Sequence, residues 1–196
     1  MFIQVSKSMD SKIQSNEELN KLWSDIRAGK SESLSKLFCF SYSWLFSYGY
    51  KIIPKEAFVK DAIQELFLIL WKKRETINDA ISVKSYLFSS LRRIIFRRLQ
   101  KKRSRMKRNH DYKKHRFKEI YNIEELMIHF ETDRHQKSQL ADAIQSLSKR
   151  QKEAIYLKFY NGLSNNEIAQ VMEINKQSVY NHVSKAINKM QEFIGV

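Results

Sequence analysis

The chain of 196 residues has room for one ordinary domain or two small helical ones. Its 4 Gly and 1 Pro are too few turn residues for an all-β sandwich, and an apolar fraction of 42% excludes a disordered chain. The formal net charge of +15 favours a polyanionic partner, either nucleic acid or an anionic membrane surface.

Four helices are predicted in the first half, because apolar residues recur there every three or four positions. The first ends at a break over residues 28–31, and the second covers residues 33–48, with aromatic side chains that we interpret as core. The third covers residues 54–74, since Pro54 is tolerated in the first turn of a helix. A turn at residues 78–79 leads to the fourth. Its inner face carries Val83, Tyr86, Leu87, Leu91, Ile94 and Ile95.

The single cysteine, Cys39, allows no internal disulfide. Its neighbours Leu37, Phe38 and Phe40 predict a buried free thiol in a reducing compartment. The N-terminus lacks the apolar run of a signal peptide, and no stretch of about 18 apolar residues could span a membrane. We therefore expect a cytoplasmic protein without stable membrane insertion.

Positive charge is concentrated in the middle of the chain. Fourteen Lys or Arg residues lie between Arg92 and Lys118, with Asp111 as the one acidic residue among them. A run this dense repels itself when alone and is typical of an interaction segment, so it favours nucleic acid or another phosphate-rich surface over a generic solvated face. Periodicity is weak over residues 105–137, which we interpret as a tethering linker with some helix at 123–130.

The last fifty residues contain two capping boxes, in which Ser opens a helix and Gln or Glu follows three positions later. They start at Ser148 and Ser164, and Asn161-Gly162 supplies the stop between the two helices. A short turn over residues 173–175 follows, in which Ile174 points inward and Asn175 caps the last helix. That helix has one apolar face, made of Val179, Val183, Ile187, Met190 and Ile194.

The opposite face of the last helix is polar in its N-terminal half. A short turn precedes this helix, and the small Ala169 lies where it is expected to cross the preceding helix. These features are the layout of a helix-turn-helix, whose second helix enters the major groove of DNA. Gln and Asn hydrogen-bond base edges there, while Lys and Ser contact phosphates. The alternative is a plain helical hairpin with a solvated face. The DNA-reading candidates are Lys176, Gln177, Ser178, Tyr180, Asn181, Ser184 and Lys185.

Both halves resemble the extracytoplasmic-function (ECF) sigma factors of bacteria, over about residues 15–103 and 138–195. The segment DAIQELFLILW at residues 61–71 is similar to the part of sigma region two that docks on the clamp helices of RNA polymerase. Residues 82–93 are similar to the segment that melts the promoter and reads its −10 element. Residues 163–183, with the helix-turn-helix, resemble region four, which reads the −35 element.

The resemblance implies an all-α protein of two small helical domains joined by a basic linker. The expected parts are an N-terminal tail (1–14), sigma region two (15–103), the linker (104–137) and sigma region four (138–196). The implied partners are core RNA polymerase, promoter DNA and an anti-sigma factor. We expect no catalytic activity, no small-molecule substrate, no metal and no cofactor.

Two groups of residues in the front half are candidates for these contacts. Asp61, Gln64 and Glu65 form one polar patch on an otherwise apolar helix, and acid on so basic a protein suits a basic surface of core polymerase. An ordinary solvated face is the alternative. Strand opening needs pockets for unstacked bases and basic residues for phosphates, although Tyr86 could equally belong to the core. The −10 candidates are Lys84, Tyr86, Ser89, Arg92, Arg93 and Arg97.

The chain departs from the family pattern in the helix-turn-helix. Glu173 and Gln177 each occupy a position where the family commonly has Gly. Arg is absent from the exposed face of the last helix. The −35 preference therefore cannot be carried over from a relative, and readout is expected to rest on Gln177, Asn181 and Lys185.

Three other classes of protein fit less well. A stand-alone regulator would normally add a receiver domain, and the front half shows no alternating strands and helices. An enzyme on nucleic acid is disfavoured because the glycines are isolated and the histidines lack paired metal-ligand spacing. A membrane-surface role is disfavoured because no long apolar anchor lies beside the basic run.

Overall fold

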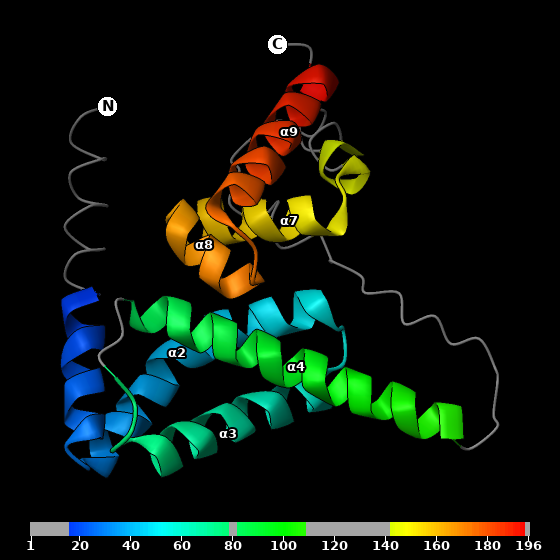
Figure 1. Cartoon of the computed structure of the whole chain (residues 1–196). Coiled ribbons are helices and arrows are strands. Elements are labelled where there is room, and N and C mark those ends of the chain that lie inside the picture. The colour runs from blue at the N-terminus through cyan, green and yellow to red at the C-terminus, as the bar shows by residue number, and fades with distance from the viewer. Residues whose placement is uncertain (1–15, 79–81, 109–141, 195–196) are drawn as a thin grey trace. The chain divides into compact units, whose positions relative to one another are not determined.

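The computed structural model describes residues 16–78, 82–108 and 142–194, and the regular elements within these ranges are all helices (Figure 1). The predicted tail over residues 1–14 and most of the predicted linker lie outside the described residues, as does the helix expected at 123–130. No helix in the described ranges combines the length and apolarity that crossing a membrane requires. The prediction of an all-α protein is confirmed.

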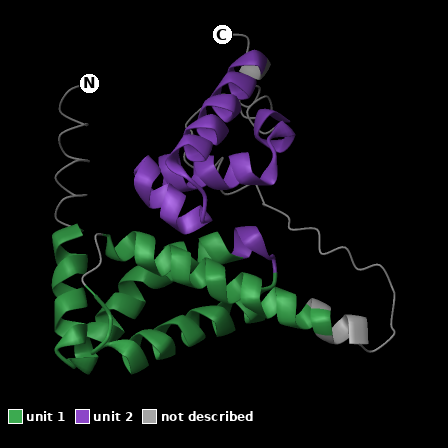
Figure 2. Ribbon diagram, in the orientation of Figure 1, with its two compact units in different colours: residues 1–49, 55–115 green, residues 50–54, 116–196 purple. Residues whose placement is uncertain are grey.

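The chain divides into two compact units, which are coloured separately in Figure 2. The first contains residues 1–49 and 55–115, and the second contains residues 50–54 and 116–196.

Among the described residues, four helices build the first unit. They are an unlabelled helix over residues 16–27, α2 (Ser31–Ile52), whose last three residues are counted with the second unit, α3 (Glu56–Lys73) and α4 (Val83–Arg108). α3 lies beside α4. α4 continues past residue 103, the expected end of the front domain, so the first residues of the predicted linker are helical.

The core of the first unit contains the apolar stripes that the sequence predicts. Because the apolar residues of each helix recur at helical spacing, each helix turns one apolar face inward. The buried residues include Leu19, Leu22, Trp23, Ile26, Leu37, Leu45, Tyr48, Val59, Ala62, Ile63, Leu66, Phe67, Leu70, Val83, Leu87, Phe88, Leu91, Ile94, Ile95 and Leu99.

Gly49 allows α2 to approach α3 and α4 closely. A Cβ atom at this position would lie 2.7 Å from Cγ1 of Val59 and 3.4 Å from Cδ1 of Ile95. Since 2.7 Å is well inside van der Waals contact, any larger residue would force the side chain of Val59 or the helices themselves to shift. The need for close packing explains a glycine inside a long helix, where it otherwise lowers stability.

Some of the predictions for α2 and α3 are wrong. Cys39 is exposed rather than buried, and Phe40 beside it is 41% exposed, because α2 turns this edge outward. Pro54 lies before the helix rather than in its first turn: Lys55 is the N-cap residue, with extended backbone, and α3 begins at Glu56.

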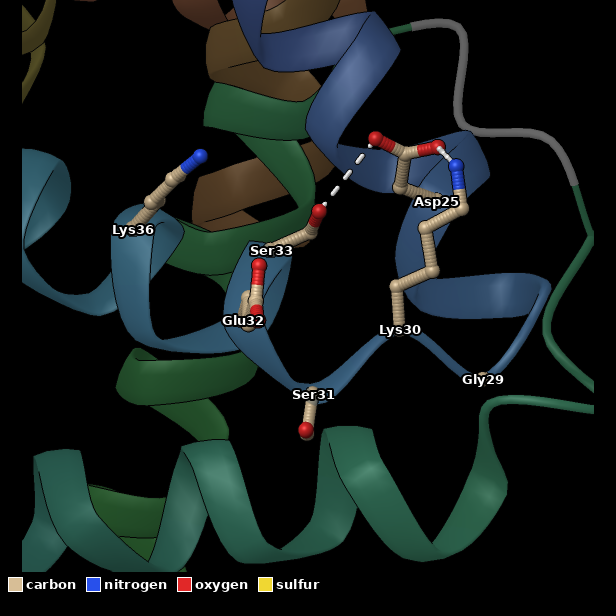
Figure 3. Close-up of a pocket in the computed structure, with 7 residues that line it drawn as sticks. All are labelled: Asp25, Gly29, Lys30, Ser31, Glu32, Ser33 and Lys36. Atoms are coloured by element: carbon tan, nitrogen blue, oxygen red, sulfur yellow. Dashed lines mark hydrogen bonds and ion pairs between the residues drawn. The ribbon is translucent and has the colours of Figure 1, made fainter.

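A polar depression lies at the turn between the first helix and α2 (Figure 3). Gly29 has a φ of +85°, which favours glycine, and Lys30 and Ser33 both donate hydrogen bonds to Asp25, at 2.7 Å and 3.2 Å. The hydrogen bond from Lys30 lowers the pKa of Asp25 below its usual value. Because both carboxylate oxygens of Asp25 are engaged within the chain, we interpret the depression as a structural turn.

The second unit contains a helix over residues 142–146, α7 (Lys149–Ile155), η1 (Tyr156–Tyr160), α8 (Asn165–Met172) and α9 (Lys176–Ile194). η1 is a π-helix that continues α7 and was not predicted from the sequence. α9 contacts both α7 and α8. Lys189 of α9 also donates a hydrogen bond of 2.7 Å to the carbonyl oxygen of Ser146.

Both predicted capping boxes are present. The hydroxyl of Ser148 accepts from the amide of Gln151, and the side chain of Gln151 accepts from the amide of Ser148. Ser164 and Glu167 make the same reciprocal pair at the start of α8. Gly162, with a φ of +67°, lies between the two helices as expected.

Candidate functional site

The turn between α8 and α9 sets the start of the candidate DNA-reading helix. Glu173 has a φ of 54° and a ψ of 48°, the left-handed conformation that glycine adopts most easily. The amide of Ile174 donates to the carbonyl of Ala169 at 3.1 Å. The side chain of Asn175 accepts from the amide of Ser178 at 2.7 Å, so the predicted cap is confirmed.

The predicted DNA-reading face of α9 is open to solvent. Tyr180 is 59% exposed, and the half-buried members are Ser178 and Ser184. Gln177 donates a hydrogen bond of 3.2 Å from Nε2 to Oδ1 of Asn181, so two amide groups are held together one helical turn apart. The exposed residues are Lys176, Gln177, Tyr180, Asn181 and Lys185.

His182 lies at the edge of this face and is half-buried. Burial lowers its pKa, and the positive charges of Arg150 and Lys185 lower it further. The positive charges of Arg150 and Lys185 also make this edge of the helix attractive to phosphate.

The front unit brings together residues that the sequence assigned to two different surfaces. Both carboxylate oxygens of Glu65 on α3 are engaged by α4: Oε1 accepts from Arg97, and Oε2 accepts from Nε of Arg98 at 2.6 Å. Arg98 also donates to the backbone carbonyl of Asp61 at 3.2 Å. Asp61 and Gln64 are exposed, whereas Glu65 is half-buried beside α4, so these three residues do not form one uniform patch.

An apolar groove lies next to Gln64 and was missed from the sequence. It is open to solvent, has a volume of about 340 Å³, and lies between α2 and α3. Leu68 is 62% exposed, although it is a large apolar residue. The position of Leu68 outside the buried stripe of α3 was the available signal in the sequence. Together with the apolar residues beside it, Leu68 forms a contiguous exposed apolar patch, which often marks a binding surface. The groove is lined by Leu34, Phe38, Gln64, Phe67, Leu68 and Trp71.

A second cavity, of about 380 Å³, lies between α3 and α4. Three of the −10 candidates line it, namely Tyr86, Arg93 and Arg97. Lys73 and Ser90 also line it and were not predicted, because the contact between α3 and α4 depends on the tertiary fold. Its apolar walls are Leu66, Ile69 and Ile94.

Tyr86 has features of both a core residue and a −10 candidate, the two roles that the sequence left open. It is half-buried, and its ring makes an edge contact with Trp23 at a centroid distance of 4.8 Å, yet it also lines the cavity.

The remaining −10 candidates lie elsewhere on α4. Lys84 is placed over the ring of Trp44, 5.6 Å from its centroid, and Arg92 lies 4.6 Å from the centroid of Phe96. The hydroxyl of Ser89 donates to the carbonyl of Tyr86 at 3.0 Å. These three are not among the residues that line the cavity.

Among the described residues, no three His, Cys, Asp or Glu side chains come together as a metal site. The exposed helix behind a capped turn and the basic helix of the front unit define a DNA-binding protein.

Comparisons with known families show which kind of DNA-binding protein this is. The family model described as Sigma-70 region 2 matches residues 41–105, and the one described as Sigma-70, region 4 matches residues 137–190. Because these segments make up more than half of the chain, it belongs to the sigma-70 family of transcription-initiation factors. The predictions of a sigma factor and of its two regions are confirmed.

Two solved structures have a similar fold. The structure of CnrH in complex with the cytosolic domain of CnrY has a TM-score of 0.59 and 15% identity, covering 91% of this chain and 97% of that one. The sigma factor RpoE in complex with the anti-sigma factor NepR from Bartonella quintana has a TM-score of 0.57 and 23% identity, covering 83% and 96%. No curated protein sequence matches the chain significantly.

Proposed function

We propose that this sigma factor is of the ECF kind and divides its work between its two units. The first unit binds core RNA polymerase and recognises and helps to melt the −10 element, and the second reads the −35 element. The observation that carries the proposal is the N-terminal face of α9, which is exposed, polar and placed directly behind a capped turn. Such a helix is suited to the major groove.

For core polymerase we propose the exposed side of α3, with Asp61 and Gln64 beside the apolar groove. The exposed Leu68 supports this surface, because a central apolar contact with a polar rim is the usual anatomy of a protein interface. Glu65 was assigned to the same surface from the sequence, but both of its carboxylate oxygens are engaged by α4.

For the −10 element we propose α4. Tyr86, Arg93 and Arg97 line a cavity that has apolar walls and basic side chains, the two features that an unstacked base and its phosphate require. Lys84, Ser89 and Arg92 lie on the same helix, and we assign to them contacts with the phosphate backbone of the DNA.

For the −35 element we propose that Gln177, Asn181 and Lys185 read bases while Lys176, Ser178 and Ser184 contact phosphates. Side-chain amides pair best with the N6 and N7 atoms of adenine in the major groove. Because Gln177 and Asn181 are hydrogen-bonded to each other, we expect them to act together on an A·T pair. Tyr180 completes the face as an apolar contact.

The proposal extends to partners and location. The chain supplies promoter specificity and has no catalytic activity of its own, since polymerase performs the phosphodiester chemistry, and it acts in the cytoplasm with the polymerase. We propose an anti-sigma partner, because the similar RpoE structure is a complex with the anti-sigma factor NepR.

In vitro transcription from a pool of genomic DNA fragments tests the function. Purified core RNA polymerase is assayed with and without the protein, and the 5′ ends of the transcripts are mapped. The proposal predicts new start sites that share a two-part motif only when the protein is present. Tight DNA binding with a silent polymerase would contradict it and favour a stand-alone regulator.

A further inference from the structure

We propose that Glu65 is a positioning residue for promoter DNA, which holds Arg97 and Arg98 of α4 in place, and that it does not contact core polymerase. The inference rests on the proposed function of α4 at the −10 element. It changes the role that the sequence pattern gives to Glu65.

The surroundings of Glu65 differ from those of the two polar residues next to it on α3. Asp61 and Gln64 are exposed, whereas the side chain of Glu65 is 27% exposed. One carboxylate oxygen accepts from Arg97, and the other accepts from Nε of Arg98 at 2.6 Å. Both oxygens are thus used inside the molecule, by residues of a neighbouring helix.

The charge of the cluster argues against a basic partner. One carboxylate between two guanidinium groups leaves a net positive charge, so the cluster attracts phosphate and repels a basic protein surface. Of the two acidic residues assigned to the polymerase surface, only Asp61 therefore keeps a negative charge that suits a basic partner. Its side chain is not needed for the cluster, because Arg98 contacts only the backbone carbonyl of Asp61.

The position of Arg97 connects the cluster to the −10 cavity. Arg97 lines that cavity together with Tyr86 and Arg93, and its side chain is 51% exposed. A long exposed side chain loses conformational entropy when it binds a ligand, and a partner that orders it beforehand reduces that loss. Glu65 supplies this ordering by fixing the guanidinium of Arg97 beside the cavity.

The test compares Glu65→Gln, Arg97→Gln and the double variant in the full-length protein assembled with core RNA polymerase. The matched control is Glu56→Gln, which removes an ion pair of 2.6 Å with Lys60 on the same helix, at a position without a proposed role. Affinity for core polymerase is measured by fluorescence anisotropy. Binding of each holoenzyme to DNA is measured with a fluorescent single strand carrying the −10 non-template sequence of a promoter that the wild-type holoenzyme transcribes.

The proposal predicts that Glu65→Gln weakens binding of the −10 strand several-fold and leaves the affinity for core polymerase unchanged, because the partly exposed ion pair that orders Arg97 is lost. The double variant should lose less strand binding than the sum of the two single losses, since Glu65 acts on the strand partly through Arg97. The Glu56→Gln control should match the wild type in both assays.

Loss of core affinity in Glu65→Gln with unchanged strand binding would overturn the proposal, and so would additive losses in the double variant. If Glu65→Gln fails to fold, as judged by circular dichroism, Glu65→Asp takes its place: it keeps the charge but shortens its reach, and the same selective loss of strand binding is expected. Failure of the proposed function is distinguishable, because the wild-type holoenzyme would then transcribe no promoter.

Discussion

The two units present their candidate DNA-binding residues in different ways. On α9 the candidates follow one another along a single helix, and the contact between Gln177 and Asn181 spans one helical turn. In the front unit Arg97 is paired with Glu65, which lies 32 positions away in the sequence. The proposed readout by the second unit therefore depends on local structure, whereas the proposed readout by the first unit depends on how two helices pack together.

This difference has a functional consequence. A helix whose polar face is open can be changed residue by residue, so that promoter preference varies while the fold is kept. In the front unit a change at either end of the Glu65–Arg97 pair disturbs both α3 and α4. We therefore expect single substitutions to act selectively in the second unit and jointly in the first.

The largest effect is expected from Gln177→Ala combined with Asn181→Ala. Losing two base-reading amides should weaken −35-dependent promoter binding by about tenfold or more, since one good amide–adenine pair contributes ~1–3 kcal/mol. Electrophoretic mobility shift of the holoenzyme on its own promoter measures the loss. Asn188→Ala, an exposed amide further along α9, is the control and should bind like the wild type. Unchanged promoter binding in the double variant would show that α9 is not the reading helix.

A smaller effect, of several-fold, is expected for Asp61→Lys on binding of core polymerase, because a charge reversed at the rim of an interface mainly slows association. Co-purification and anisotropy with core polymerase measure it. The internal ion pairs of Glu65 should survive, since only the backbone of Asp61 takes part in that cluster. Equal loss of −10 strand binding would show instead that the two surfaces of α3 are not separate.

The smallest effect is expected in the turn before α9. Glu173→Gly should raise the free energy of unfolding by about 1 kcal/mol, because a left-handed backbone is strained for any residue with a Cβ. Urea denaturation followed by circular dichroism measures the change. The matched control Gln170→Gly lies inside α8 and should lower stability by about the same amount. A loss of stability in Glu173→Gly would mean that contacts of its side chain outweigh the strain.

The same distinction explains how much could be predicted from the sequence. Both capping boxes, the Asn175 cap and the apolar stripes depend on residues a few positions apart, and the structure confirms them. The unit boundaries and the roles of the individual site residues stay predictions.

What could not be predicted depends on the approach of distant segments. The exposure of Cys39 follows from which edge of α2 the other helices cover. The Glu65 ion pairs and the cavity between α3 and α4 require the two helices to be packed together. The π-helix over residues 156–160 has no signature in its side-chain spacing that separates it from the end of α7.

The central claim, that the two units read different promoter elements, is tested most directly by tethered DNA cleavage. Cys39→Ser removes the single native thiol, and one cysteine is then added at Gln100 on α4 or at Asn188 on α9, both of which are exposed. An iron chelate attached there cleaves the DNA nearest to it in the holoenzyme–promoter complex. The account predicts cleavage around the −10 element from position 100 and around the −35 element from position 188. Cleavage of one and the same element from both positions would contradict it.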